Sequence, residues 1–311
     1  MEIINQLDQL PQSPGFLAVT LGNFDGLHSG HRLLIRQLRA DAEQHQGKGL
    51  VFTFEPHPAT IVAPQRIPQR LTTKEEQISL LEAAGVDYLL YHPFTPQLAQ
   101  LSAWEFISKL LHEQLQARSV IVGPNFHFGH QRQGDVALLR KWGAELGFTT
   151  RIVEPARENN QIISSSRIRQ LLAMGEVSQA ARLLGYAYYL QGAVISGAAR
   201  GREMGYPTLN MTLPAKLIPA SGVYLTQAQL NGKNHFGVSN LGLRPTFHEH
   251  TLTLETHFLD YQEEVRPTAL KLHFLQRIRD ERKFASITEL IAQIEKDTRT
   301  AYEYINQTSH P

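Results

Sequence analysis

The sequence predicts an α/β domain built on a parallel sheet, followed by a small antiparallel β-barrel with a terminal helix. The chain has 311 residues, a length that suits two domains of ordinary size. Up to about residue 184, apolar runs alternate with helical patterns, as in a parallel sheet wrapped by helices. Beyond it, short alternating runs are broken by glycine, proline and asparagine, which is typical of a small barrel. We therefore place two domains at residues 1–184 and 185–311.

In the first domain, strands are predicted from short apolar runs and helices from their period and caps. Leucines recur at helical spacing over residues 33–38, after the glycine-containing turn that follows the first strand. Thr73 with Glu76, and Ser102 with Glu105, form capping boxes that begin two further helices. The predicted strands are 16–21, 49–54, 86–91, 119–122 and 150–153, a fourth helix begins near 135, and two short helices at 165–174 and 177–184 close the domain.

In the second domain the period changes to the alternation of half-buried strands. Ser286 with Glu289 then predicts the start of a final amphipathic helix lying on the barrel. The predicted strands are 188–195, 222–230, 235–240, 251–259 and 269–274.

Composition excludes several functional classes. With 30 basic and 29 acidic side chains, the chain offers no bulk charge for a nucleic-acid or membrane partner. The absence of cysteine excludes disulfides, thiolate catalysis and cysteine-ligated zinc. The N-terminus lacks the pattern of a secretory signal, and no apolar run approaches the length of a membrane span. We expect a cytoplasmic protein, a monomer or weak oligomer, whose partners are small molecules.

The segment from Gly22 to His31, GNFDGLHSGH, joins the first strand to the first helix. Glycines let the backbone approach a ligand closely, and a helix N-terminus offers N–H groups to an anion. His28 and His31 lie three residues apart, so both rings can face one phosphate chain and stabilise charge on a pentavalent phosphorus. The plainer interpretation is a glycine turn with two surface histidines, but the strand–turn–helix context favours a phosphate site.

Three more segments lie where ligands bind in parallel sheets. Residues 163–169, ISSSRIR, begin a helix and offer hydroxyls to a phosphate, although serines also cap helices that bind nothing. Residues 53–58, TFEPHP, and 122–129, VGPNFHFG, each end a strand, and ligands bind at the carboxyl ends of such strands. The phenylalanines of these two segments can flank a planar ring, although phenylalanines there are more often core.

Together the four segments resemble the FMN adenylyltransferase module of bacterial bifunctional riboflavin kinase/FAD synthetases, a Rossmann-like domain of the nucleotidylyltransferase superfamily. The resemblance implies in-line attack of the FMN phosphate on the α-phosphorus of ATP, with release of pyrophosphate. It implies that His28 and His31 are catalytic and stabilise the triphosphate. The ATP site expected from the motifs comprises Gly22, Phe24, Asp25, Gly26, His28, Gly30, His31, Ser164, Ser165, Ser166 and Arg169. The expected flavin site comprises Phe54, Pro56, His57, Pro58, Asn125, Phe126 and Phe128.

The barrel region carries a second group of segments. Residues 192–210 combine glycines and small residues with arginines, a composition that lets backbone amides surround phosphates. Thr208 and Asn210 alternate along an extended chain and so face the same way, and their neutral oxygens suit magnesium. Taken alone, such a stretch more often means only a turn.

Read in order with residues 238–247, 254–260 and 277–284, this stretch resembles the riboflavin kinase domain. The resemblance implies a six-stranded barrel, with Thr208 and Asn210 holding magnesium-ATP. It implies that Glu255 is the catalytic base for the riboflavin 5′-hydroxyl, which attacks the γ-phosphate. The expected ATP site comprises Gly197, Arg200, Gly201, Arg202, Gly205, Pro207, Thr208 and Asn210, and the expected flavin site Glu255 and Arg279.

The sequence departs from the family pattern at several positions. Ser166 stands where threonine is usual, Asn125 where many members have aspartate, and Ile162 where a basic residue is common. In the kinase half, Leu209 replaces alanine, and residues 264–267 replace a common Leu-Tyr-Gly. We expect an enzyme that uses ATP twice, making FMN from riboflavin and then FAD from FMN. The alternatives are an FMN adenylyltransferase with a weakened kinase domain and a flavin-binding regulatory module without turnover.

Overall fold

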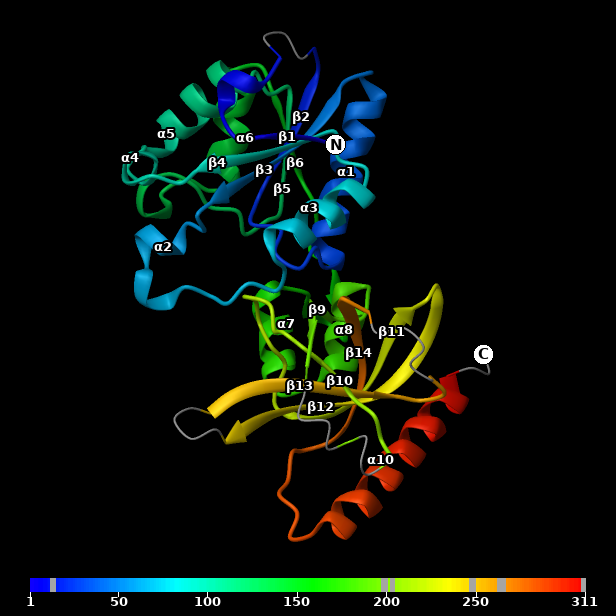
Figure 1. The fold of residues 1–311 in the computed structure, drawn as a ribbon. Helices are drawn as coiled ribbons and strands as arrows, with labels where there is room; N and C mark the ends of the chain where they lie inside the picture. Colours follow the sequence, from blue (N-terminus) through cyan, green and yellow to red (C-terminus); the bar gives the residue numbers. More distant parts are fainter. Residues whose placement is uncertain (12–14, 197–200, 202–204, 246–249, 262–266, 309–311) are drawn as a thin grey trace. The chain divides into compact units, whose positions relative to one another are not determined.

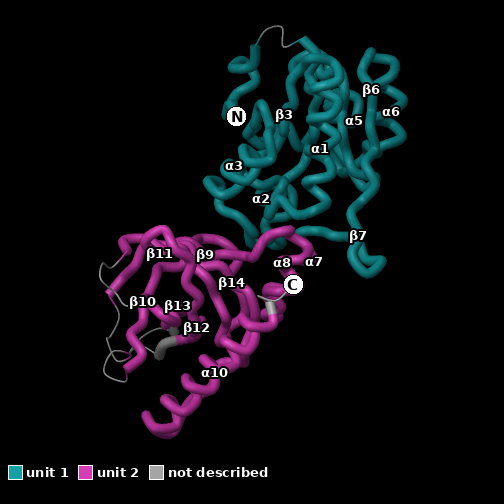
Figure 2. Tube along the Cα trace, turned by 90° about the vertical axis from the view of Figure 1, so that its right-hand side faces the viewer, with its two compact units in different colours: residues 1–165 teal, residues 166–311 magenta. Residues whose placement is uncertain are grey.

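The computed structural model describes residues 1–311 apart from 12–14, 197–200, 202–204, 246–249, 262–266 and 309–311. By contacts, the chain divides into two units, residues 1–165 and 166–311, which Figure 2 colours separately. The predicted Gly197, Arg200 and Arg202 lie outside the described residues.

The first unit contains a parallel sheet of six strands in the order β1-β4-β3-β2-β5-β6 (Figure 1). Its strands are β1 Glu2–Ile4, β2 Leu17–Leu21, β3 Lys48–Glu55, β4 Tyr88–Pro93, β5 Ser119–Val122 and β6 Thr149–Ile152, with a small hairpin of β7 Arg157–Glu158 and β8 Gln161–Ile162. The predicted parallel sheet is confirmed. The edge strand β1 and the hairpin were not predicted, because two or three residues are too few to show a period.

Helices lie on both faces of this sheet. The helices are α1 Ser29–Gln44, α2 Ala59–Val62, α3 Lys74–Ala83, α4 Pro96–Ala99, α5 Ala103–Glu105, the π-helical η3 Phe106–Gln114 and α6 Val136–Glu145, with 3₁₀ turns η1 Leu7–Gln9, η2 Pro64–Arg66 and η4 His130–Arg132. The predicted capping boxes at Thr73–Glu76 and Ser102–Glu105 are both present.

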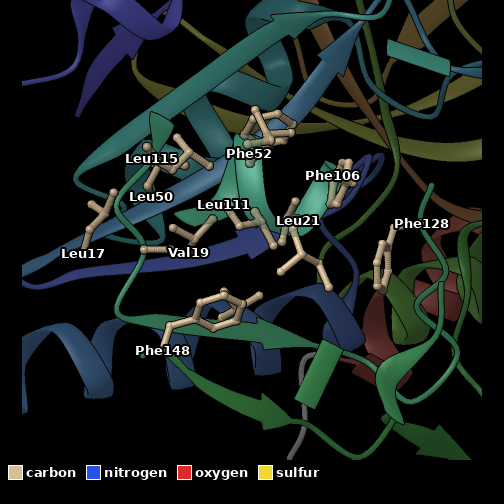
Figure 3. Close-up of a cluster of buried hydrophobic side chains, with 14 of the residues drawn as sticks. Leu17, Val19, Leu21, Leu50, Phe52, Phe106, Leu111, Leu115, Phe128 and Phe148 are labelled. Carbon is tan, nitrogen blue, oxygen red and sulfur yellow. The ribbon is translucent and has the colours of Figure 1, made fainter. Parts of the chain in front are cut away.

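The strand β2 shows how the core is divided between the two faces. Its residues are all buried, and alternate side chains point to opposite sides. Leu17, Val19 and Leu21 join the cluster with η3 and α6 that Figure 3 shows in part, whereas Ala18 packs with residues of α1 and α3. A strand buried on both faces explains why the run from 17 to 21 is apolar at nearly every position.

The order of the strands places a crevice at one edge of the sheet. After β2 the chain builds β3 and β4 to one side and then returns to add β5 and β6 on the other side of β2. Ligands in open α/β sheets bind where the order reverses in this way, outside the carboxyl ends of the strands. That point lies between the segments that follow β2 and β5.

The second unit contains a closed antiparallel barrel in the order β10-β13-β12-β11-β14-β9, which confirms the predicted six-stranded barrel. The terminal helix α10 packs on its outer side through Ala301, beside Val223 and Val238 (Figure 1). The strands are β9 Tyr189–Ile195, β10 Leu209–Met211, β11 Gly222–Leu230, β12 Lys233–Pro245, β13 His250–Phe258 and β14 Ala269–Arg279, and the helices are α7 Ser165–Ala173, α8 Val177–Leu184 and α10 Ile287–Thr308.

The helices α7 and α8 are fastened to this barrel. The Ala220 N–H donates to the Leu172 carbonyl (2.9 Å), and the Arg277 guanidinium donates to the carbonyls of Met174 (3.0 Å) and Ser221 (2.6 Å). The contact division therefore falls before residue 166. The predicted division of functional modules after residue 184 stays a prediction.

Candidate active sites

The turn after β2 is held in a defined shape before any ligand is considered. Phe24, Gly26 and Leu27 have positive φ values of 45°, 79° and 37°, and the side chains of Phe24 and Leu27 are fully buried. The Asp25 carboxylate accepts hydrogen bonds from the N–H groups of Leu71 (2.9 Å) and Thr72 (3.1 Å). Asp25 thus ties the turn to a neighbouring segment, and its predicted part in ATP binding stays a prediction.

His28 caps the helix that follows. Its Nδ1 accepts a hydrogen bond from the His31 N–H (3.3 Å), so the proton of a neutral His28 ring lies on Nε2. A Cβ on Gly30 would lie 3.1 Å from the His28 ring, closer than such contacts usually are. Glycine at this position therefore avoids a steric conflict with the ring. The first N–H groups of the 16-residue helix α1 and the His28 Nε2–H form a donor set for an anion.

His31 lies directly beside His28. The two imidazoles stack, with ring centroids 3.7 Å apart and planes 16° apart. Burial, and to a smaller extent the neighbouring His28, hold the pKa of His31 well below its ordinary value of 6.5. Its buried Nδ1 makes no hydrogen bond to any described residue. The structure thus brings the two predicted histidines together as one donor pair, with a neutral His31.

The serine segment reaches the same turn. The Ser165 hydroxyl donates to the Asp25 carbonyl (3.0 Å), and the Ile163 carbonyl lies 3.6 Å from the position of a Cβ on Gly30. Ser164 lies between these two residues in the chain. Ser166 and Arg169 belong to α7 in the second unit, and their part in ATP binding stays a prediction.

A cavity of about 820 Å³ opens at the carboxyl ends of the strands in the first unit, at the reversal of strand order. Of the residues predicted for ligand binding, Gly22, Phe54, Pro58, Phe126 and Phe128 line it. Pro56, His57 and Asn125 do not line it, although the His57 Nε2 lies 2.9 Å from the side-chain amide of Asn23, which does. The predicted site residues did not include Asn23, Phe94, Phe106, His127 or the segment from Gly129 to Arg132, which also line the cavity.

Five phenylalanines contribute to the cavity wall. Phe126 and Phe128 are stacked at 5.6 Å between centroids, Phe106 lies 5.4 Å from Phe128, and Phe54 meets Phe94 edge to face at 5.2 Å. Such a wall suits a flat aromatic ligand. The rule that pointed to Phe54 at the end of β3 applies equally to Phe94 at the end of β4, so this residue had a signal in the sequence.

The second predicted site is assembled by the register of the barrel. Asn210 on β10 lies opposite Glu255 on β13, and Glu255 lies opposite Asn240 on β12. Residues directly opposite each other in an antiparallel pair share one face, so these three polar side chains form a row. Leu254 and Thr256 are buried, which places half-buried Glu255 on the other, outer face.

The oxygen donors of this row fit a magnesium ion. Asn210, 6% exposed, and Glu255 bring an amide oxygen and a carboxylate to one face, and Thr208 lies two residues before Asn210 on the extended chain. Before β10, the Tyr206 N–H donates to the Gly201 carbonyl (2.7 Å), and Gly205 has a φ of 83°. His257 Nδ1 lies 2.9 Å from the Pro207 carbonyl and so ties the residue before Thr208 to β13.

Arg279 has extensive protein contacts. Its Nε and Nη2 donate to the buried Asp297 carboxylate of α10 (2.9 and 2.8 Å), and its Nη1 donates to the Asp280 carbonyl (2.9 Å). Arg279 thereby joins β14 to α10. Its predicted contact with flavin stays a prediction.

Comparison with known proteins identifies both halves of the chain. Residues 11–167 match the family model of FAD synthetase, and residues 184–305 match that of riboflavin kinase. The helices α7 and α8 lie almost entirely between the two matches. Within the described residues, none of the helices combines the length and the apolar character that a membrane crossing requires.

Relatives match over the whole chain. The bifunctional riboflavin kinase/FMN adenylyltransferase of Escherichia coli K12 is 38% identical, over 98% of this chain and 97% of that protein. Its counterpart in Pseudomonas fluorescens is 34% identical over the full length of both. A solved structure described as a macrolide-efflux protein from Streptococcus pneumoniae has a TM-score of 0.87 at 29% identity and covers 96% of this chain and 98% of its own.

Proposed function

Because this chain belongs to the family of bifunctional riboflavin kinase/FMN adenylyltransferases, it converts riboflavin to FMN and FMN to FAD, and we propose how its residues divide the two reactions. The comparisons favour neither the single-activity alternative nor the regulatory one. The kinase reaction is assigned to the barrel and adenylyl transfer to the parallel-sheet unit. We place the functional division after residue 184, and the start of the riboflavin kinase match at that residue supports this choice.

In the kinase reaction Glu255 accepts the proton of the riboflavin 5′-hydroxyl. The freed oxygen attacks the γ-phosphorus of ATP, the bond to the bridging oxygen breaks, and ADP leaves. Thr208 and Asn210 would hold the magnesium ion of magnesium-ATP, and that ion would neutralise charge on the phosphates. The observation that supports this division of roles is the register that sets Asn210 opposite Glu255.

In adenylyl transfer an oxygen of the FMN phosphate attacks the α-phosphorus of ATP, and pyrophosphate leaves. The Nε2–H of His28, neutral His31 and the N-terminus of α1 donate to the phosphate oxygens as charge develops. The flavin ring occupies the aromatic cavity. The supporting observation is that the cavity adjoins the phosphate-binding turn in the chain: Gly22 and Asn23 line the cavity, and the turn that follows them carries His28.

The remaining expectations form part of the same proposal. The enzyme requires magnesium, takes ATP, riboflavin and FMN as its small-molecule partners, and acts in the cytoplasm as a monomer or weak oligomer. A chain without cysteine has no need of an oxidising compartment.

Two variants test the division of labour. With riboflavin, magnesium and ATP, Glu255→Gln should make no FMN, yet it should still convert added FMN to FAD. The double variant His28→Ala with His31→Ala should make FMN at the normal rate and no FAD. Glu303→Gln, an exposed position on α10, serves as the matched control and should retain both rates. Loss of both reactions in either folded variant would refute the assignment.

A further inference from the structure

The segment from Gly123 to Gly134, here called the strap, crosses the ligand-binding edge of the sheet. It leaves β5, which β2 and β3 separate from β4. Nevertheless the His130 N–H donates to the Leu101 carbonyl (2.7 Å), and His130 Nδ1 lies 3.1 Å from the Ala99 carbonyl, both in the stretch after β4. The strap therefore joins the end of β5 to the stretch that follows β4, and its residues from Phe126 to Arg132 line the aromatic cavity.

The shape of the strap is specified along its length. Gly129 has a φ of 73°, and a Cβ there would lie 2.7 Å from backbone atoms of Ala103. Gln131 and Arg132 are consecutive non-glycine residues in the left-handed region, with φ values of 51° and 61°. Such residues are strained and persist where the surroundings impose them, often at ligand sites. Here both line the aromatic cavity.

The tip of the strap, residues 130–132, adds polar side chains to the cavity lining. Side chains in that lining that can form hydrogen bonds come from Gln100 and from the strap residues His127, His130, Gln131 and Arg132. A carbonyl only accepts, so the contact with Ala99 puts the proton of neutral His130 on Nδ1 and leaves Nε2 as an acceptor. The Arg132 guanidinium has only donors, and it forms no ion pair with any described residue. The strap tip thus offers one acceptor, His130 Nε2, and one donor group, the Arg132 guanidinium, two residues apart in the chain.

From these contacts we propose that the strap tip recognises the pyrimidine edge of the flavin ring during adenylyl transfer. That edge is a carbonyl, an N–H and a second carbonyl in sequence. Arg132 donates to a carbonyl oxygen, and His130 Nε2 accepts from the N–H between the two carbonyls. The opposite edge of the ring carries only methyl groups and packs on the phenylalanines. The proposal rests on the assignment of FMN to this cavity.

The order of the strands agrees with this placement. The turn that carries the phosphate-binding histidines follows β2, and the strap tip is fastened to Ala99 and Leu101 in the stretch that follows β4. Phe54, at the end of the intervening β3, lies between them. A flavin with its phosphate at the first position and its ring over Phe54 brings one edge to the tip.

The test compares FMN with N3-methyl-FMN, in which the edge N–H is replaced by N–CH₃. Wild type should prefer FMN about tenfold or more in kcat/KM for adenylyl transfer. His130→Asn retains a donor for the Ala99 carbonyl but loses the Nε2 acceptor, and it should lower kcat/KM for FMN alone, so that the preference falls towards unity. Arg132→Asn, a residue that tolerates positive φ, should lower kcat/KM about 10- to 100-fold through KM, and Arg132→Lys should restore part of it.

The outcomes separate this inference from the assignment beneath it. Phe128→Leu should raise the KM for both flavins alike if the cavity holds the ring, and an unchanged KM would overturn the cavity assignment itself. If Phe128→Leu behaves as expected but wild type accepts both flavins equally, or both strap variants lose activity equally on both, recognition of the edge by the strap is refuted. Thermal unfolding of each variant distinguishes these losses from misfolding.

Discussion

The ring of Phe128 lies directly against Gly134, so closely that any Cβ at position 134 would overlap it. The two residues also exchange backbone hydrogen bonds, at 3.1 Å from the Phe128 N–H and 2.9 Å from the Gly134 N–H. This pair joins the residues on either side of the strap tip and fixes the position of the Phe128 ring, which lines the cavity.

Gly134→Ala should therefore displace Phe128 and raise the KM for FMN in adenylyl transfer about tenfold, while riboflavin phosphorylation on the other unit stays unchanged. Steady-state kinetics of both reactions check this. Gly123→Ala, in the same strap but with open space around its would-be Cβ, is the matched control and should behave as wild type. An unaltered KM in Gly134→Ala would show that the position of Phe128 does not matter for flavin binding.

The depressed pKa of His31 predicts how stability depends on pH. The folded protein holds this ring neutral, whereas the unfolded chain takes up a proton as the pH falls through about 6.5. The unfolded state then binds more protons, so the free energy of unfolding of the first unit should fall as the pH drops below that value. Denaturant titrations at several pH values should show a weaker dependence in His31→Gln. Identical pH profiles for variant and wild type would contradict the burial of a neutral ring.

The ion pair between Arg279 and Asp297 should stabilise the second unit. Asp297 is 3% exposed in its side chain, and its removal leaves the guanidinium without its carboxylate in a largely buried place. Asp297→Ala should cost about 3–5 kcal/mol in the free energy of unfolding of that unit. Chemical denaturation followed through the second unit measures the cost. Glu303→Ala, exposed on the same helix, should change little, and an equal loss in both variants would argue against a special role for the pair.

Asn210 should control the magnesium requirement of one reaction only. Asn210→Ala should raise the magnesium concentration that half-saturates FMN formation about tenfold, because a ligand oxygen is lost, and should leave FAD formation from FMN unaffected. Magnesium titrations of each reaction measure this. Asn240→Ala changes the same side chain on the other flank of Glu255 and should have the smaller effect. A larger effect of Asn240→Ala would indicate that the magnesium ion binds on the Asn240 side of Glu255.

Much of the fold was predictable because its signals are local. The buried run of β2, the capping box at Thr73 and Glu76, and the change from helical to alternating period all act within a few residues. The edge strand β1 escaped prediction because its three residues acquire a strand conformation only by pairing with β4. The strap tip was not predicted for a similar reason. Its position depends on contacts with residues that follow β4, whereas the strap itself follows β5, three strands away in the sheet.

The sequence by itself determined the kinds of element, their order and the two sets of motifs, because hydrophobic period, turn chemistry and helix capping depend on neighbours in the chain. Only the tertiary structure decided which predicted groups meet. Barrel register sets Asn210 beside Glu255, backbone N–H groups engage Asp25, and Asp297 engages Arg279. Such partners lie far apart in the chain, and the pairing of strands and the packing of helices bring them together.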